Sequence, residues 1–147
     1  MKYIAQLKRQ RKILNEIFDR KEIYTKRYRK GGWTGKELLI HIKDSETVSY
    51  DRLRRIIAEE KPLLLFFEQA QWQNNLRYMK QDIKLAKDVF LSTRDSFIET
   101  VEMHLKKYGK KEGVHSRRGL MTMNRLIEHH LWHVDHHINH MKKIHGF

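Results

Sequence analysis

The sequence contains no cysteine among its 147 residues, which excludes a disulfide scaffold, a zinc site built on thiolates and a cysteine nucleophile. Proline occurs once, at Pro62, and glycine only seven times, so long stretches contain no residue that breaks a helix. The longest apolar run, from Leu63 to Phe67, is far shorter than the roughly 20 residues that a membrane-spanning helix needs. We therefore expect one helical domain over residues 1–147, with no membrane span.

Acidic residues are few relative to basic ones. Asp and Glu number 18 against 31 Lys and Arg, which gives a formal net charge of +13, and residues 1–30 hold eleven basic residues against three acids. A basic helical face is the electrostatic footprint of nucleic-acid binding, so a nucleic-acid-binding helical protein is one alternative, although no known nucleic-acid motif accompanies the charge. The first ten residues are too charged for a secretory signal, which predicts a cytoplasmic protein.

Apolar residues recur at helical spacing in four long segments. The predicted helices run from about residue 3 to 27, 34 to 58, 82 to 108 and 122 to 144. Thr34 and Glu37 have the spacing of a capping box at the start of the second helix. Residues 62–80 form a long connection, in which residues 62–67 could be a turn of helix, and residues 109–119 form a basic loop. No segment shows the alternation typical of a strand, so the pattern predicts an all-α four-helix bundle with a long connection between helices two and three.

Histidine is abundant, and seven of the ten histidines fall in the last 19 residues. Two imidazoles one turn apart on a helix converge, which is the arrangement that a shared metal ion requires. Three pairs have this spacing: His129 with His133, His133 with His137, and His136 with His140. Spacing alone does not choose between them.

A helical wheel separates these pairs. The apolar side of the last helix consists of Met123, Leu126, Ile127, Val134, Ile138 and Met141. His130, His133 and His137 border this side, whereas the other clustered histidines rotate further out. The wheel therefore favours His133 with His137 as a pair that points into the bundle. The alternative is that the histidines are packed or solvated side chains that bind no metal.

A divalent ion needs at least a third protein ligand, and the histidines outside the cluster are His41, His104 and His115. His41 lies on the inward side of the second helix, so the wheel permits it to face the same cavity. Asp44, one turn further on, could orient a ligand imidazole or be an exposed helix charge. Arg52 turns toward the side that bears His41, where it could meet an anionic substrate group or extend to solvent.

Two motifs resemble the DinB/YfiT-like metalloenzyme family. One is Gly32-Trp33-Thr34 followed by the segment from Leu39 to Ser45, and the other runs from Trp132 to Met141 and is similar to the family's C-terminal histidine signature. The resemblance implies a four-helix bundle, often dimeric, and a metal site formed by one histidine of the second helix and a pair on the last. Carried over, these residues are His41, His133 and His137.

The resemblance also implies the chemistry. Some family members are thiol S-transferases that use a low-molecular-weight thiol, and others are metal-dependent hydrolases. We therefore expect one divalent ion per chain, Zn²⁺ or Ni²⁺, an open coordination position, a small-molecule substrate and a homodimer. A metal-binding bundle without catalysis is a further alternative. The chain departs from the pattern at Glu46-Thr47-Val48, where close relatives have His-Met-Asn, and at Ser116, where the family usually has proline.

Overall fold

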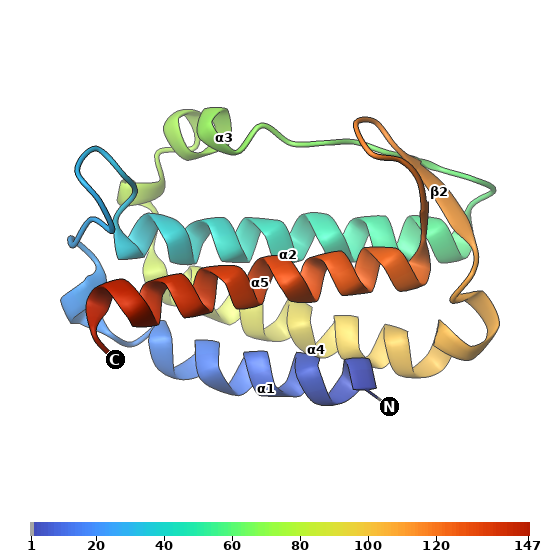
Figure 1. Cartoon of the computed structure of the whole chain (residues 1–147), viewed down its shortest axis with the longest axis horizontal. Helices are drawn as coiled ribbons and strands as arrows, with labels where there is room; N and C mark the ends of the chain where they lie inside the picture. Colours follow the sequence, from blue (N-terminus) through green and yellow to red (C-terminus); the bar gives the residue numbers. More distant parts are fainter. Residues whose placement is uncertain (1) are drawn as a thin grey trace.

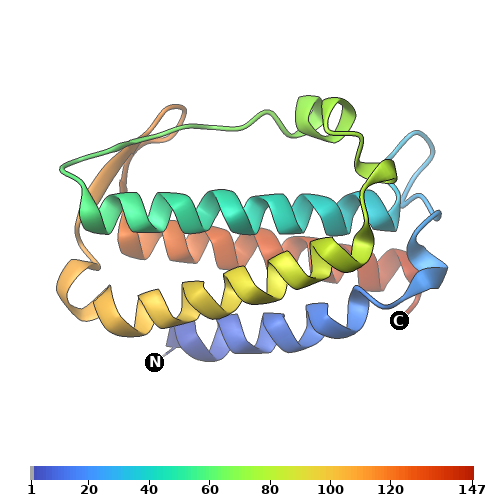
Figure 2. The ribbon, with the colours of Figure 1, turned by 180° about the vertical axis from the view of Figure 1, so that it is seen from behind.

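The computed structural model describes residues 2–147, which fold into a bundle of four long helices (Figure 1). The helices are α1 (Lys2–Ile17), α2 (Gly35–Ala58), α4 (Ile83–Tyr108) and α5 (Met123–His145). Each packs against two neighbours, so that α2 and α5 lie side by side and α1 and α4 complete the bundle below them in these views (Figures 1 and 2). The predicted four-helix bundle is confirmed, and its core consists of the apolar stripes of all four helices.

Polar caps fix where three of these helices begin. The predicted capping box is present in α2: the Thr34 side chain accepts a hydrogen bond from the backbone N–H of Glu37, and the Glu37 carboxylate accepts one from the backbone N–H of Thr34. Asp82 caps α4 and Thr122 caps α5 in the same way, each accepting backbone N–H bonds from the first turn. These helices therefore lie within one or two residues of their predicted bounds.

The first helix is shorter than predicted, because α1 ends at Ile17 instead of continuing to about residue 27. A 3₁₀ turn, η1 (Lys21–Ile23), follows it. Phe18 and Ile23 are both almost completely buried, whereas an unbroken helix would place them about 140° apart around its axis. The chain therefore leaves the helix so that both side chains reach the core. The Tyr24 hydroxyl donates a hydrogen bond to the Phe18 carbonyl oxygen and holds this turn.

The connection between α2 and α4 contains β1 (Leu63–Leu64), α3 (Gln69–Asn75) and the 3₁₀ turn η2 (Tyr78–Lys80). In both ribbon views it runs along the side of α2 that faces away from α1 and α4 (Figures 1 and 2). The expectation of a helical turn at residues 62–67 is therefore wrong.

The basic loop is also more ordered than predicted, because it forms the hairpin of β2 (Glu112–His115) and β3 (Gly119–Thr122). These strands are antiparallel, and β1 adds to β2 in parallel to give a three-stranded sheet. The N–H of Val114 donates to the Pro62 carbonyl oxygen at 2.8 Å, and the N–H of Ser116 donates to the Leu64 carbonyl oxygen at 2.9 Å. β1 has only two residues and pairs with β2 about 50 residues further along the chain, so no local alternation marks it.

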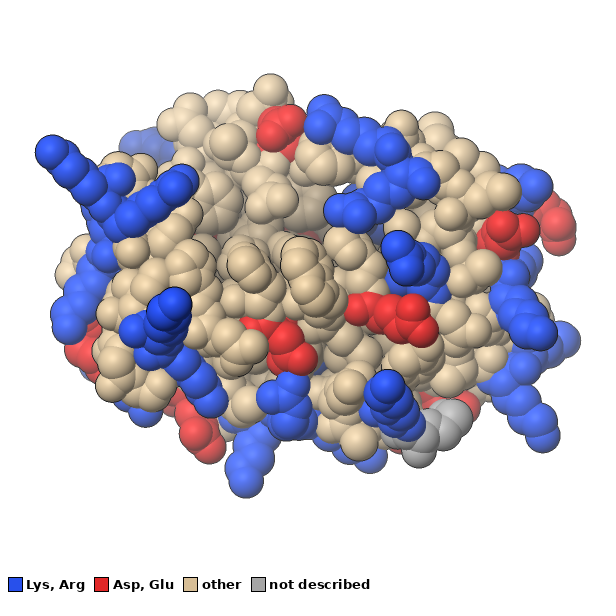
Figure 3. Space-filling view, viewed as in Figure 1, with Lys and Arg blue, Asp and Glu red and all other residues tan. Residues whose placement is uncertain are grey.

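The basic residues of α1 largely pair with acids on neighbouring helices. Arg9 lies 2.6 Å from Asp135 on α5, and Arg11 lies 2.5 Å from Asp95 on α4. Figure 3 shows Lys and Arg side chains scattered over one face with acidic side chains among them, instead of gathered in a stripe. This distribution gives little support to the nucleic-acid alternative. None of the described helices combines the length and apolar content needed to cross a membrane.

Candidate metal centre

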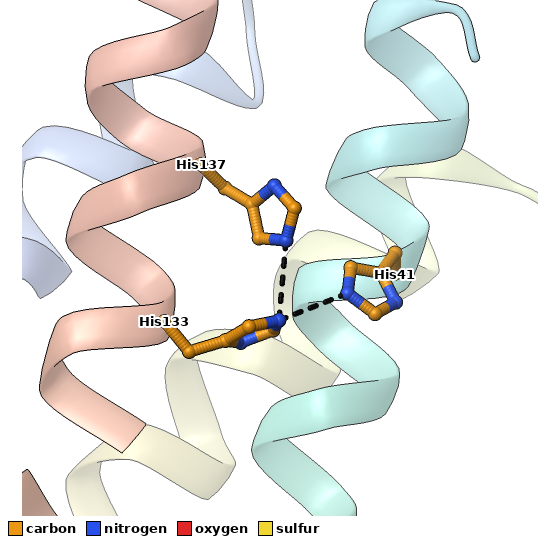
Figure 4. Close-up of side chains that lie close together, drawn as sticks. All are labelled: His41, His133 and His137. Carbon is orange, nitrogen blue, oxygen red and sulfur yellow. Dashed lines mark hydrogen bonds between the residues drawn. The ribbon is translucent and has the colours of Figure 1, made fainter. Parts of the chain in front are cut away.

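Three histidine side chains from two helices meet at one point (Figure 4). His41 comes from α2, and His133 and His137 come from consecutive turns of α5. The Nε2 atom of His133 lies 3.2 Å from Nε2 of His41 and 3.1 Å from Nε2 of His137. One ring nitrogen from each residue lies within 4.8 Å of the others, so this group could hold a metal ion.

Helix packing explains why these histidines meet. Val134 and Ile138 are buried on the core side of α5, which turns the flanking His133 and His137 toward α2. His41 is completely buried on the facing side of α2. The structure thus brings together the pair that the helical wheel favoured, His133 and His137, and His41, which the family resemblance added.

The remaining histidines lie outside the converging group, although His115, His129, His130 and His136 line the cavity next to it. His129 and His136 stack on either side of the exposed Trp132, with ring centroids 5.8 and 5.5 Å from it. His140 packs against the edge of Tyr28, outside the group of three. His104 is on α4, beside Tyr108. His115 and His130 are buried near the site, but neither belongs to the converging group.

Burial keeps the three converging imidazoles neutral. It lowers the pKa of His41 to about 4, although the negative charge of Asp44 acts in the opposite direction. Burial and the neighbouring histidines lower the pKa of His133 to about 2 and that of His137 to about 3. Neutral imidazole has a free lone pair and is the form that binds metal ions. At neutral pH the three rings therefore offer nitrogen donors without competition from protons.

The spacing of the nitrogens fits a first-row metal ion. Two imidazole nitrogens bound to tetrahedral Zn²⁺ at about 2.0–2.1 Å lie roughly 3.3 Å apart. The observed Nε2 separations of 3.1 and 3.2 Å are close to that value. Moreover, the Nδ1 atoms of His41 and His137 are buried without a hydrogen-bond partner among the described residues. An ion shared by the Nε2 atoms would place the proton of each neutral ring on Nδ1. It would also remove the repulsion between the three Nε2 lone pairs.

Aromatic packing orients these rings, and Asp44 does not. The Asp44 carboxylate accepts a hydrogen bond from the Tyr78 hydroxyl at 2.5 Å and pairs with the Lys43 ammonium at 2.6 Å, leaving the His41 Nδ1 atom unbonded. The rings of Trp33 and Phe67 lie 5.3 and 6.1 Å from the His41 ring. Both alternatives for Asp44 are therefore wrong, because it holds no ligand imidazole and, at 6% exposure, it is not an exposed helix charge.

A cavity of about 360 Å³ opens beside the three histidines, between α2, α5, the long connection and the β-hairpin. His133 and His137 line it, and Phe66 and Phe67 of the connection form an apolar part of its wall. Five further residues considered from the sequence also line it: Arg52, His115, His129, His130 and His136. A volume of this size lies at the lower end of the range for small-molecule sites.

Sequence reasoning missed a buried polar network behind the cavity. Arg94 of α4 donates two hydrogen bonds to the Glu46 carboxylate of α2, at 2.6 and 2.8 Å, and all atoms of both side chains are buried. His130 of α5 lies 2.6 Å from the same carboxylate through its Nε2 atom. Gln10 of α1 accepts a bond from Arg94 at 3.0 Å and donates one to the Leu131 carbonyl oxygen at 2.8 Å. The network thus joins all four long helices.

A signal for this network was present in the sequence. Arg94 stands between Phe90 and Phe97 in the apolar stripe of α4, and Glu46 stands between Ile42 and Leu53 in that of α2. A charged residue at a core position is rarely tolerated without a partner. Two opposite charges in the stripes of two helices therefore indicate a buried ion pair between them.

Comparison with known proteins gives a consistent result. The family model of the DinB superfamily matches residues 5–141. The chain is 22% identical over 119 residues to BH0277 of Halalkalibacterium halodurans, covering 81% of this chain and 69% of that protein. It is 26% identical over 129 residues to OB0413 of Oceanobacillus iheyensis, covering 82% of this chain and 69% of that protein. Both relatives carry the name "Putative metal-dependent hydrolase".

The fold also matches a solved structure. YfiT from Bacillus subtilis, described as "a probable metal-dependent hydrolase with an unusual four-helix bundle topology", is similar with a TM-score of 0.87. The match covers 97% of this chain and 83% of that one at 20% sequence identity. At this identity the likeness establishes the shared four-helix-bundle fold.

Proposed function

The chain belongs to the DinB superfamily, and we propose that it is a metal-dependent hydrolase that acts in the cavity beside His41, His133 and His137. The observation that carries this proposal is the meeting of three neutral imidazoles, two of which, His133 and His137, line a cavity large enough for a small molecule. The names of the relatives support the same reaction class.

In this proposal the three Nε2 atoms hold one divalent ion per chain. Zn²⁺ and Ni²⁺ are the favoured ions because imidazole is a good ligand for both. Three neutral ligands leave the charge of such an ion uncompensated, so that when bound it supplies Lewis acidity at an open coordination position.

The residues of the chain would bind and orient the substrate. His41, His133 and His137 determine where the ion is held, and therefore which bond of a substrate in the cavity is polarised. Phe66 and Phe67 would cover the apolar part of the substrate and exclude water from that side. The Glu46 carboxylate accepts a hydrogen bond from His130 Nε2 and so fixes the orientation of a further ring at the cavity wall.

Transfer of a low-molecular-weight thiol is a second candidate function. None of the residues that line the cavity, among residues 2–147, is an Asp or Glu, whereas two arginines and several histidines line it. Nearby positive charge favours a thiolate over a thiol, so this lining suits a thiol substrate as well as an acyl substrate.

Two further expectations from the sequence stay predictions: that the protein forms a homodimer and that it is located in the cytoplasm. Analytical ultracentrifugation tests the first, and cell fractionation tests the second.

One preparation distinguishes these activities. Wild-type protein and His133→Ala are assayed for hydrolysis of small esters and amides, and for transfer of a cellular thiol to an electrophile. We expect the wild type to turn over at least one substrate class, with loss of nearly all activity in His133→Ala and after treatment with a chelator. His140→Ala is the matched control because its ring packs against Tyr28 and does not line the cavity, so this variant should retain activity. Turnover that is equal in wild type and His133→Ala would contradict the proposal.

A further inference from the structure

Two arginines line the cavity, and no acidic residue among residues 2–147 does. Arg52 of α2, Arg118 of the turn between β2 and β3, and His115 at the end of β2 all line it together with His133 and His137. Figure 3 shows Lys and Arg side chains beside a hollow that lies above α5 in this view. The three residues come from different elements, so the fold and not a local run of sequence brings them together.

The Arg52 guanidinium is only partly satisfied by the protein. One terminal N–H group donates to the Leu65 carbonyl oxygen, but the Nε atom is buried with no hydrogen-bond partner among the described residues. No carboxylate within residues 2–147 forms an ion pair with this side chain, and none lines the cavity. Burial, and then the charge of Arg118, lower the pKa of Arg52. The charge of Asp51 acts in the opposite direction, but a partly buried arginine without an ion pair still carries a free-energy cost that a bound anion would reduce.

His115 is arranged as a neutral hydrogen-bond donor. Its Nδ1 atom accepts hydrogen bonds from the backbone N–H groups of Arg117 and Arg118, at 3.1 and 3.2 Å. The ring proton is therefore on Nε2. Burial and the charges of Arg52 and Arg118 lower the pKa of His115, which keeps the ring neutral. His115 thus adds a donor beside the two arginines without adding a third charge.

We propose that the cavity selects small-molecule substrates that carry an oxyanion group, a carboxylate or a phosphate, and that Arg52 and Arg118 hold this group while the scissile bond faces His133 and His137. A guanidinium group presents donors in a fixed fork that matches both kinds of oxyanion. Cleavage of such a substrate rests on the proposed hydrolase function, whereas binding of its oxyanion depends only on Arg52 and Arg118. The remote anion would position the substrate in the cavity.

Isothermal titration calorimetry of the purified full chain tests this assignment. The probes are glutarate, inorganic phosphate and the neutral diamide glutaramide. We expect glutarate or phosphate to bind more tightly than glutaramide, and the stronger of the two anions identifies the preferred oxyanion. A hydrogen bond to a charged group is worth roughly 1.5–3 kcal/mol, so Arg52→Gln and Arg118→Gln should each weaken anion binding about 10- to 100-fold.

Arg54→Gln is the matched control for Arg52. Arg54 is on the same helix, but its side chain is half exposed, lies 3.7 Å from Asp51 and covers the Tyr50 ring. This variant should bind the anions as the wild type does. Arg118 is an exposed turn residue, so Arg118→Gln provides a test even if Arg52→Gln fails to fold.

If the anion bound to the metal ion instead of to the arginines, anion binding would depend on His133 and not on Arg52 or Arg118. His133→Ala should keep the arginine-dependent binding of glutarate or phosphate, because the arginines remain. The proposal is overturned if both anions bind no more tightly than glutaramide, or if binding is lost in His133→Ala and unchanged in Arg52→Gln and Arg118→Gln. Arginine-dependent binding without any turnover would contradict the hydrolase and leave the anion site intact, so the two proposals fail separately.

Discussion

His133→Ala is expected to weaken the binding of Zn²⁺ and Ni²⁺ more than about 100-fold, because outer partners of metal ligands already contribute 10- to 100-fold and a direct ligand contributes more. His133 has the central position, since its Nε2 atom contacts those of both His41 and His137. His41→Ala and His137→Ala should show losses of similar size. Isothermal titration calorimetry of each purified variant with the metal ion measures the loss of affinity.

The controls for this prediction lie on the same helix. His136→Ala and His140→Ala remove imidazoles with the same spacing that lie outside the converging group, and should change metal affinity little. Circular dichroism of each variant checks that the bundle has folded. If His136 and His140 proved to be the essential pair, the metal site would lie on the outer face of α5 and the account given for the cavity would be wrong.

Glu46→Ala is expected to lower the free energy of unfolding by roughly 3–5 kcal/mol, because it leaves the Arg94 guanidinium buried without its carboxylate. For a domain of this size the loss corresponds to a fall of about 10 °C in the melting temperature. Asp95→Ala is a matched control, since Asp95 follows Arg94 in the sequence but pairs with Arg11 at the surface. An exposed pair contributes at most about 1 kcal/mol. Equal melting temperatures for Glu46→Ala and the wild type would contradict the structural role of the network.

The same carboxylate gives this stabilisation a defined pH dependence. Burial raises the pKa of Glu46, but the charges of Arg94 and His130 lower it by more, so that it falls from 4.5 to about 2. Because the folded-state pKa lies below the unfolded-state value, the ionised carboxylate stabilises the fold fully above pH 4.5 and progressively less as the pH falls toward 2. The stability difference between wild type and Glu46→Gln should therefore narrow over this interval. Chemical denaturation at several pH values measures it.

The helical part of the fold could be predicted because its signals are local. Thr34, Asp82 and Thr122 each stand directly before a run of apolar residues at helical spacing, and each caps a helix in the structure. The end of α1 could not be predicted, because the chain leaves the helix in order to bury Ile23 beside Phe18, and that contact depends on tertiary packing. The strands were missed for the same kind of reason, since β1 pairs with β2 about 50 residues further along the chain.

The histidines of the candidate site could be predicted because the face of a helix on which a residue lies follows from its spacing in the sequence. The period of α5 separates His133 and His137 from His136 and His140, and this difference is visible in the sequence alone. The cavity itself was not predictable. Arg118 and His115 reach it only because the hairpin pairs with β1 of the long connection, which no local pattern encodes. Arg52 could be assigned to the correct side of α2, but not to a cavity.

Elemental analysis of the untagged purified protein tests the central claim, a metal centre of three histidines, most directly. We predict about one divalent ion per chain, Zn²⁺ or Ni²⁺, in the wild type and in His136→Ala, and almost none in His41→Ala or His133→Ala. Removal of the ion from the wild type should lower its melting temperature, because the ion binds the folded state in preference to the unfolded state. Wild-type protein that contains no metal and takes up neither added Zn²⁺ nor added Ni²⁺ would contradict the claim.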